Sequence, residues 1–440
     1  MGTILSEELV SRVCGDPVFP RMGLIEQQWS TDPVPEDGIP DRVRTAVGSL
    51  GLEALETGST VALGVGSRGI AYIPTIVRTA VEAVRERGLE PIVVPAMGSH
   101  GGATAEGQTE KLESLGITPE SIGCPIEATM DVTTIGRTDE HDIPVRIDEI
   151  VARADAIVPI NRVKPHTDFQ GDVESGIAKM LVIGMGNQTG AKATHEWAVE
   201  VGFETAIREM AAHLLEELPV AGGIAIVEDE NDETATIDGV PASDLFGREA
   251  DLLRRAYEHL PQIPFDDIDV LVVDRMGKEI SGAGMDTNVI GRLDEVKRQS
   301  PKRPTVKRIF VRSLTETSGG NADGFGVADF IHQDLLSAAD LEKTLTNSLT
   351  SGAVRGSRIP PTVENDRAGL IASLSTIGPP DPERDRVVRI TDTMHLRRLY
   401  VSAALIEEAR DREDLEVVLE PADIAFTAEG NFADPSAADR

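Results

Sequence analysis

The side chains best suited to chemistry in this sequence are histidines and lysines set among glycines. His100 lies in the run MGSHGGAT (97–104), directly after a stretch typical of a strand. A histidine beside glycines is not held in an apolar core, and imidazole gains and loses a proton near neutral pH. His100 is therefore a candidate acid/base, and the alternative is a histidine with a purely structural role in a turn.

A longer glycine-rich segment, residues 161–198, gathers further basic side chains. It contains Lys164, His166, Lys179, Lys192 and His195, and thus three of the nine lysines of the chain. Backbone N–H groups at such turns, together with a lysine, could cradle a phosphate group. A metal site built from His100, His166 and His195 is a second interpretation, although their spacing is not the HExxH pattern of zinc peptidases.

The run VGSRGI places Ser67 and Arg68 between glycines after another apparent strand. An arginine in such a turn suits an anion, and a structural turn with one exposed arginine is the alternative. The glycines do not match the GxGxxG fingerprint of dinucleotide-binding folds. A GxSxG nucleophile motif and a Walker phosphate-binding motif are both missing from the sequence.

These three segments follow short β-rich runs that alternate with helical patterns. The predicted strands are 60–66, 91–96, 155–160, 223–229, 270–274 and 308–313, and the clearest predicted helices are 73–88, 203–218 and 243–260. Such alternation predicts an α/β fold with mainly parallel sheets covered by helices. Ligands of open parallel sheets bind just beyond the carboxyl ends of the strands, and the three segments are expected there.

Two prolines and three acids in residues 260–269 separate a long helical pattern from a new strand. We therefore expect an N-terminal α/β cofactor-binding domain at 1–262 and a C-terminal α/β domain at 263–415, with the active site in the cleft between them. The acidic tail, 416–440, is expected either to be disordered in part or to pack back on the N-terminal domain.

The chain of 440 residues carries 42 Lys+Arg against 75 Asp+Glu, a formal net charge of −33. This balance argues against nucleic acids and anionic membrane surfaces as partners. Only nine of the 42 basic residues are lysines. Excess carboxylates with few lysines are typical of a halophilic cytoplasmic protein, because molar salt screens the repulsion between charges. The alternative is an acidic mesophilic enzyme.

The acidity is uneven along the chain. Residues 153–195 hold five Lys+Arg against four Asp+Glu, and residues 275–312 hold ten against four. These basic islands contain candidate lysines of both expected domains. They favour a small anionic ligand such as a nucleotide or a carboxylate substrate.

Two cysteines, Cys14 and Cys124, are too few for a disulfide framework or a CxxC metal site. The first residues lack the pattern of a signal peptide, and no apolar run approaches the roughly 20 residues needed to cross a bilayer. We expect a soluble, reduced, cytoplasmic protein. His141, in the acidic run TDEHD, is expected to be solvated, and His213 and His259 are expected at helix surfaces or ends.

In the order and spacing of these residues the chain resembles the lactate racemase family. Members of that family carry a nickel-pincer nucleotide, a nicotinate-derived mononucleotide whose ring carbon and two sulfurs hold nickel. The resemblance covers most of the chain and rests on the Arg68 turn, the GSHGG run (98–102) and the segment from Lys164 to His195. Arg68 and His100 are 32 residues apart, and Lys179 and His195 are 16 apart, both close to the family's spacing.

The resemblance implies an isomerase that racemises or epimerises a lactate-like 2-hydroxy acid by reversible hydride transfer to the cofactor. His100 and His166 would be the two acid/base groups on opposite faces of the substrate, because the hydroxyl lies on a different side in each enantiomer. Lys179 would be joined to the cofactor, and His195 would be the nitrogen ligand of a square-planar nickel. Partners would include the proteins that synthesise the cofactor.

The resemblance also implies the remaining contacts. Arg68, with Ser67 beside it, would meet the cofactor phosphate or the substrate carboxylate, and Lys164 would meet the substrate. In the second domain, the run 277–292 stands where the family has cofactor and substrate contacts. Its candidates are Lys278 and Asn288 for the cofactor and Arg292 for the substrate.

The chain departs from the family at three places near these residues. Val65 replaces an acidic residue, Gly101 replaces an arginine, and residues 176–178 (GIA) replace a Gly-Gly-Arg run. Two other readings therefore stay open. One is a nicotinamide-dependent 2-hydroxy acid dehydrogenase, suggested by the strand, turn and helix at 60–88, and the other is a non-catalytic protein that binds nickel or a nucleotide.

Overall fold

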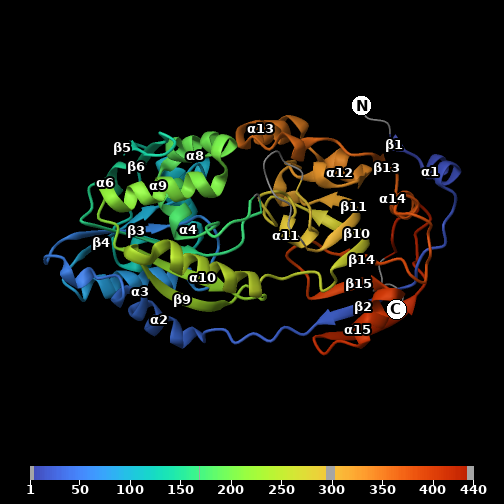
Figure 1. Ribbon diagram of the computed structural model, residues 1–440, viewed down its shortest axis with the longest axis horizontal. Coiled ribbons are helices and arrows are strands. Elements are labelled where there is room, and N and C mark those ends of the chain that lie inside the picture. The colour runs from blue at the N-terminus through green and yellow to red at the C-terminus, as the bar shows by residue number, and fades with distance from the viewer. Residues whose placement is uncertain (1–3, 168, 294–302, 434–440) are drawn as a thin grey trace. The chain divides into compact units, whose positions relative to one another are not determined.

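The computed structural model describes residues 4–167, 169–293 and 303–433. The chain divides into two compact units, of which unit 2 is Thr31–Leu260 and unit 1 joins Met1–Ser30 to Pro261–Arg440. Both units are α/β, with sheets made mainly of parallel strands, as the alternating pattern predicts (Figure 1). No helix within the described ranges is both long enough and apolar enough to cross a membrane.

Unit 2 is built on a five-stranded sheet. Its strands in spatial order are β4 (Glu90–Pro95), β3 (Thr60–Val65), β7 (Ala156–Arg162), β8 (Gly222–Glu228) and β9 (Thr234–Pro241). The first four strands are parallel, and β9 pairs antiparallel with β8 at the edge. A separate antiparallel hairpin consists of β5 (Val132–Arg137) and β6 (Pro144–Asp148).

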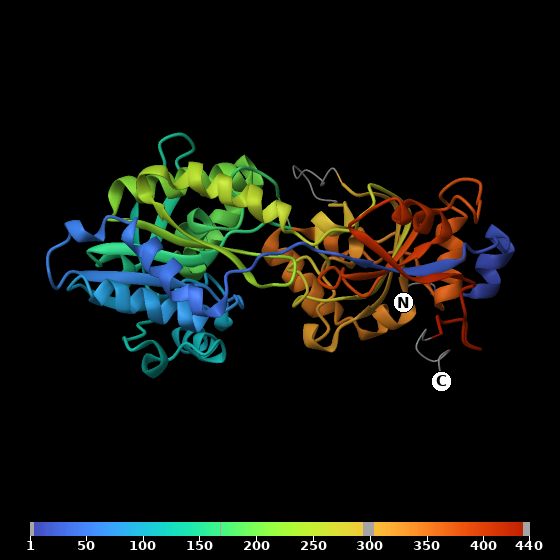
Figure 2. The same cartoon turned by 90° about the horizontal axis from the view of Figure 1, so that it is seen from below.

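Helices cover both faces of this sheet (Figures 1 and 2). On one face, α2 (Ile39–Gly48) and α3 (Ile73–Arg85) pack on Val61 and Leu63 of β3. On the other, α9 (Phe203–Glu217) and α10 (Leu245–Glu258) share a core with Ala62. Successive side chains of a strand point to opposite faces, so a strand that is apolar throughout is covered on both.

Five further α-helices complete the described part of unit 2. They are α4 (Ala105–Ser114), α5 (Pro119–Ile122), α6 (Glu149–Ala152), α7 (Ile177–Lys179) and α8 (Asn187–Val201). A π-helix, η4 (Met180–Gly184), follows α7 without a break. Such π-turns are rare and occur frequently at functional sites.

Unit 1 contains a nine-stranded sheet. Its strands in spatial order are β1 (Ile4–Leu5), β13 (Thr362–Val363), β12 (Phe330–His332), β11 (Thr305–Leu314), β10 (Asp267–Met276), β14 (Val387–Ile390), β15 (Arg398–Ser402), β2 (Met22–Gln27) and β16 (Leu415–Ala422). The strands from β1 to β14 are parallel, and β15, β2 and β16 pair antiparallel.

The faces of the unit 1 sheet are again covered by helices. The helices of this unit are α1 (Glu7–Cys14), α11 (Thr287–Ile290), α12 (Gln333–Ala338), α13 (Leu341–Ser351), α14 (Asp366–Leu374) and α15 (Ala403–Arg410). Val270 and Val272 share a core with α1 and α14, whereas Leu271 and Val273 share one with α12 and α15. This is the same alternation as in unit 2.

The division of the chain differs from the predicted one at both ends. Residues 1–30, which the sequence-based boundary assigns to the N-terminal domain, belong to unit 1 because β2 pairs with β15 and β16. The tail also packs within unit 1. Its Phe426 ring lies 5.5 Å from that of Phe19, and the Phe432 ring lies 4.5 Å from the guanidinium of Arg389. Residues 434–440 of the predicted tail lie outside the described residues.

Candidate active site

Ser67 and His100 meet at the carboxyl ends of two neighbouring parallel strands. Ser67 follows β3 and His100 follows β4, so the pairing of these strands brings their loops together. The Ser67 hydroxyl, which is buried, lies 2.5 Å from Nδ1 of His100. A ring that donates this hydrogen bond from Nδ1 keeps the lone pair of Nε2 for a ligand.

The surroundings of His100 favour its neutral form. Although the residue reaches solvent, the pKa of its imidazole is lowered to about 4. The main cause is loss of hydration among neighbouring atoms, and the positive charges of Arg68, Lys179 and Lys111 act in the same direction. His100 is therefore a neutral acid/base candidate in a positive field at pH 7. An anion bound among these cations would raise the pKa of His100 back toward its ordinary range.

Close packing of glycines places the π-helix against the His100 loop. The Gly98 N–H donates to the Gly184 carbonyl over 2.9 Å. A Cβ at Gly184 would lie 2.8 Å from the Ala96 carbonyl oxygen, and one at Gly98, whose φ is +61°, would lie 3.0 Å from that of Ile183. These glycines therefore allow two backbones to touch. From the sequence, by contrast, we interpreted the glycine-rich turns of residues 161–198 as a possible cradle for a phosphate group.

Lys179 ends the short helix α7, directly before the π-helix. Its Nζ lies 3.5 Å from the Ser175 hydroxyl, and the side chain is half-buried. Ser175 in turn pairs with the backbone of Lys164, whose N–H donates to the Ser175 carbonyl over 2.8 Å. Lys164 is exposed. Ser175 therefore contacts both predicted lysines, Lys164 through the backbone and Lys179 through its side chain.

A buried glutamate that the sequence interpretation did not single out caps the Lys179 helix. Glu249 on α10 accepts the Ala178 N–H at 2.9 Å and is fully buried. Burial raises the pKa of Glu249 to about 7, and the hydrogen bonds from the backbone of Ala178 and Ile177 oppose that rise. The signal was available, because Glu249 interrupts the apolar stripe of α10, in which Leu245, Leu252 and Leu253 are buried.

His166 and His195 lie against the same aromatic ring. The Phe203 ring is 6.3 Å from that of His166, nearly parallel, and 5.3 Å from that of His195, edge-on. Phe169 stacks between these elements, 4.5 Å from His166 and 5.0 Å from Phe203. Phe203 opens α9 and His195 lies on α8, so the turn between the two helices brings residues of three segments together. Offset aromatic contacts of this kind fix ring orientation.

A second buried carboxylate, Glu174, orders the loop that carries His166. It accepts the His166 backbone N–H at 2.6 Å, the Gly171 N–H at 3.0 Å and the Tyr257 hydroxyl at 2.9 Å. Burial raises the pKa of Glu174, and these hydrogen bonds oppose the rise. Glu174 was also missed from the sequence, where it looks like one more acid in an acidic chain.

Unit 2 thus holds two neighbouring groups of predicted residues. The first comprises Ser67, Arg68, His100 and Lys179, and the second comprises His166 and His195 about Phe203. The loop from Lys164 to Lys179 belongs to both, because it carries His166 near its start and Lys179 at its end. The arrangement provides a neutral imidazole, two further imidazoles and cations suited to an anionic ligand.

The three predicted residues of unit 1 are engaged with their own unit. Lys278 Nζ lies 3.0 Å from an Asp323 oxygen, and Asn288, which is buried, donates to Asp286 at 3.1 Å. Arg292 donates to Asp329 at 2.6 Å and to three backbone carbonyls, including that of Val306 at the start of β11. Arg292 therefore lies by the amino ends of the strands, opposite the edge where parallel sheets bind ligands.

Among the other histidines, His259 is the C-cap of α10 and so lies at a helix end as predicted, whereas His141 and His213 are less exposed than expected. His141, predicted to be solvated, has its Nδ1 2.6 Å from a Glu209 oxygen, and His259 Nδ1 lies 3.4 Å from Glu230. His213 Nε2 is buried against β5, where a Cβ at Gly136 would lie 2.5 Å from it. The charged neighbours of His141 and His259 are distant in sequence, which is why the pattern did not reveal them.

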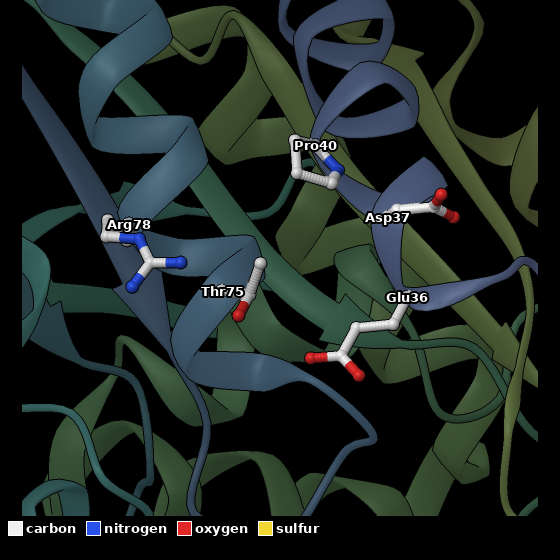
Figure 3. Close-up of a pocket in the computed structure, with 5 residues that line it drawn as sticks. All are labelled: Glu36, Asp37, Pro40, Thr75 and Arg78. Carbon is white, nitrogen blue, oxygen red and sulfur yellow. The ribbon is translucent and has the colours of Figure 1, made fainter.

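A hollow of about 500 Å³ opens elsewhere in unit 2 (Figure 3). Its lining residues come from η1 (Glu36–Gly38), α2 and α3, and are Glu36, Asp37, Pro40, Thr75 and Arg78. Its lining holds two carboxylates and a guanidinium but no group that exchanges protons near pH 7 when unperturbed. It contains no predicted site residue, so we do not assign the chemistry to it.

No protein-family model matches the chain, and no curated protein matches it either. Among solved structures, a structural-genomics protein from Thermotoga maritima is similar, with a TM-score of 0.51 and 15% identity over 84% of this chain and 99% of that one. The lactate racemase apoprotein from Thermoanaerobacterium thermosaccharolyticum aligns with a TM-score of 0.46 and 12% identity over 85% and 84%. The Thermotoga likeness shows that this two-unit α/β fold occurs in a protein of distant sequence.

Proposed function

We propose that the protein is an isomerase that racemises or epimerises a 2-hydroxy acid with a nickel-pincer nucleotide as cofactor. One observation carries the proposal: His100 is hydrogen-bonded to Ser67 and is held neutral beside Arg68 and Lys179. This set suits removal of a hydroxyl proton from an anionic substrate, because the base is neutral and the cations attract the carboxylate. The resemblance to lactate racemases in residue order adds the identity of the cofactor.

The residues of unit 2 fit the cofactor in type and charge. Lys179 is half-buried at the end of a capped helix, in the same positive field as Arg68, which suits covalent attachment and an anionic nucleotide. His195, on the neighbouring helix α8, offers an imidazole nitrogen of the kind that nickel accepts. When bound, the cofactor would supply a centre that accepts hydride from the substrate carbon and returns it.

The chain's own residues perform the proton chemistry. Arg68 binds the carboxylate, and Nε2 of His100 takes the hydroxyl proton when the bonded Nδ1 donates to Ser67. His166 serves the opposite enantiomer from the other face. Its ring is backed by Phe169 and Phe203, which exclude water from one side and hold its orientation.

The test is isomerisation by protein made in a host that builds the cofactor. Single enantiomers of several 2-hydroxy acids are supplied, and chiral chromatography follows the other enantiomer while metal analysis counts nickel. We expect nickel near one per chain and loss of activity in Lys179→Ala. Hydride transfer also predicts that the α-hydrogen is not replaced by deuterium from the solvent.

Lys192→Ala is the matched control, because this lysine of the same segment is exposed and pairs only loosely with Glu196, at 3.7 Å. It should leave nickel content and activity unchanged. Isomerisation without nickel, or full activity in Lys179→Ala, would overturn the proposal. Saturable NAD binding with ketoacid formation would instead support a nicotinamide-dependent dehydrogenase.

A further inference from the structure

Three potential metal ligands meet where the β5–β6 hairpin turn faces α9. Glu140 and His141 lie in the turn and Glu209 lies on the helix, and one ligand atom of each lies within 4.8 Å of the others. His141 Nδ1 is already 2.6 Å from Glu209 Oε1. The two elements are 68 residues apart in sequence at this contact, so the fold itself assembles the group.

The surrounding hydrogen bonds hold the ligands in place. Thr138 donates its hydroxyl proton to Glu209 Oε2 over 3.1 Å, and the same hydroxyl oxygen accepts the Ile143 N–H at 3.1 Å. The Thr138 N–H donates a hydrogen bond to the Ile143 carbonyl over 2.9 Å, which closes the turn. An outer hydrogen bond that orients a ligating carboxylate is the usual companion of a metal site.

Within the described part of the chain, no lysine or arginine neutralises the two carboxylates of this cluster. The nearest arginine in the turn, Arg137, is paired with Asp142 at 2.6 Å. Across the residues that the structure describes, no lysine or arginine pairs with Glu140 or Glu209, and the ion pair of Glu209 is with His141. Two carboxylates with one imidazole therefore leave room for a divalent cation to supply the missing positive charge.

We propose that Glu140, His141 and Glu209 bind a zinc-type divalent transition metal. An imidazole with two carboxylates suits such an ion, whereas Ca²⁺ and Mg²⁺ prefer oxygen ligands alone. Tetrahedral Zn²⁺ separates neighbouring ligand atoms by about 3.3 Å, given metal–ligand distances near 2.0 Å. Small side-chain rotations reach that spacing, and Glu140 is exposed and therefore adaptable. Water would complete the coordination.

The site is separate from the one proposed above. Glu209 lies six residues beyond Phe203 on α9, roughly 9 Å along the axis at 1.5 Å per residue. A metal here would join the hairpin to the helix that also supports His166 and His195 through Phe203. Zinc binding by Glu140, His141 and Glu209 is independent of the isomerase activity proposed above, and is expected whether or not that activity is found.

The experiment is equilibrium dialysis of chelator-treated protein against Zn²⁺, with bound zinc counted by atomic absorption. His141→Asn and Glu140→Gln should each weaken zinc binding at this site by about tenfold or more, so one zinc per chain is lost at limiting metal. Asp139→Asn, which removes an exposed neighbouring charge outside the cluster, is the matched control and should stay within about twofold. Mg²⁺ in excess should not displace the zinc.

The variant His195→Ala distinguishes this zinc ion from zinc bound by other histidines. It should retain the ion that we assign to Glu140, His141 and Glu209. Amide exchange in residues 138–143 should also slow when zinc is added to the wild type and not to Glu140→Gln. The proposal fails if the wild type retains no zinc at micromolar free metal, or if affinity in both ligand variants matches that of Asp139→Asn. Circular dichroism checks folding, and Glu140→Gln, at an exposed position, is the variant least able to disturb it.

Discussion

Arg68 and Arg292 were both predicted to bind an anion, but the partners of the two guanidinium groups differ. Arg292 of unit 1 makes four hydrogen bonds, one to Asp329 and three to backbone carbonyls. Arg68 of unit 2 is exposed just beyond the carboxyl end of β3, and within the described residues no carboxylate forms an ion pair with it. Its charge instead acts on His100, where it lowers the imidazole pKa.

The contrast distinguishes charged side chains that stabilise the fold from those that are placed to bind a ligand. A guanidinium that already has an acidic partner and several carbonyls is part of the packing of its unit, and removing it leaves those partners without a donor. Cations gathered around a neutral imidazole repel one another, and a bound anion would relieve that repulsion. Composition cannot make this distinction, because it counts Arg68 and Arg292 alike as basic residues of an acidic chain.

The largest expected effect is the loss of stability in Arg292→Ala. We expect the free energy of unfolding of unit 1 to fall by about 3 kcal/mol, because Asp329 and three carbonyls lose a charged donor. The two tryptophans make the measurement specific, since Trp29 packs on the core of unit 1 and Trp197 on that of unit 2. Urea unfolding followed by fluorescence in a Trp197→Phe background reports on unit 1.

Arg292→Lys tests the geometry of that contact, because lysine keeps the charge without the planar fork. It should recover less than half of the lost stability. An Arg292→Ala protein as stable as the wild type but unable to turn over substrate would reverse the assignment and make Arg292 a ligand residue.

Next in size is the loss of activity in Arg68→Ala. In the proposed function Arg68 attracts the substrate carboxylate, so its removal should lower kcat/KM about 100-fold, which corresponds to about 2.7 kcal/mol of transition-state stabilisation. Unfolding free energy should change by less than about 0.5 kcal/mol, because the side chain is exposed. Arg68→Ala should thus lose activity and keep its stability, whereas Arg292→Ala should lose stability.

The pH profile of Arg68→Ala provides a second measurement. Arg68 lowers the pKa of His100, so its removal should raise that pKa. The acid limb of kcat/KM, which reports a base that must be deprotonated, should then move to higher pH. A limb that stays in place or moves to lower pH would mean that His100 is not the base.

Glu249 gives an effect of intermediate size on the stability of unit 2. Burial raises its pKa from 4.5 to about 7, so the folded state holds a proton that the unfolded state has released between those values. The stability that this proton contributes is complete below pH 4.5 and is lost as pH rises through 7. The wild type should therefore lose about 2 kcal/mol across this window, below the limit of about 3 kcal/mol set by the full shift.

Glu249→Gln keeps an acceptor for the Ala178 N–H and removes the titration. In this variant the free energy of unfolding of unit 2 should no longer fall by about 2 kcal/mol between about pH 5 and pH 8. Trp197 fluorescence in a Trp29→Phe background measures it. An equal slope in Glu249→Gln and the wild type would assign the pH dependence to another group. Activity should change less than in Arg68→Ala, since Glu249 is fully buried and contacts the backbone of the Lys179 helix.

Much of the framework was predictable from the sequence because it depends on local pattern. The strand at 60–66 and the helix at 203–218 match β3 and α9 to within one residue at each end. The antiparallel strands β9 and β2 were missed. β2 lies between β15 and β16, whose residues are near the other end of the chain, and such distant partners leave no local pattern. The place of His100 after a strand was also predictable, whereas its bond to Ser67 depends on the register of β3 with β4.

The smallest expected effect is the loss of rate in Ser67→Ala. It tests whether Ser67 and His100, at the carboxyl ends of β3 and β4, act together. The Ser67 hydroxyl lies 2.5 Å from His100 Nδ1, so it orients the ring and, in the proposed function, the nitrogen that takes the substrate proton. Ser67→Ala should lower kcat by about tenfold, close to 1.4 kcal/mol, with little change in KM, because the substrate keeps its contact with Arg68. Ser67→Thr, which retains a hydroxyl, should recover most of the rate. A rise in KM with unchanged kcat would instead place Ser67 among the groups that bind the anion, together with Arg68, and would leave His100 without an orienting partner.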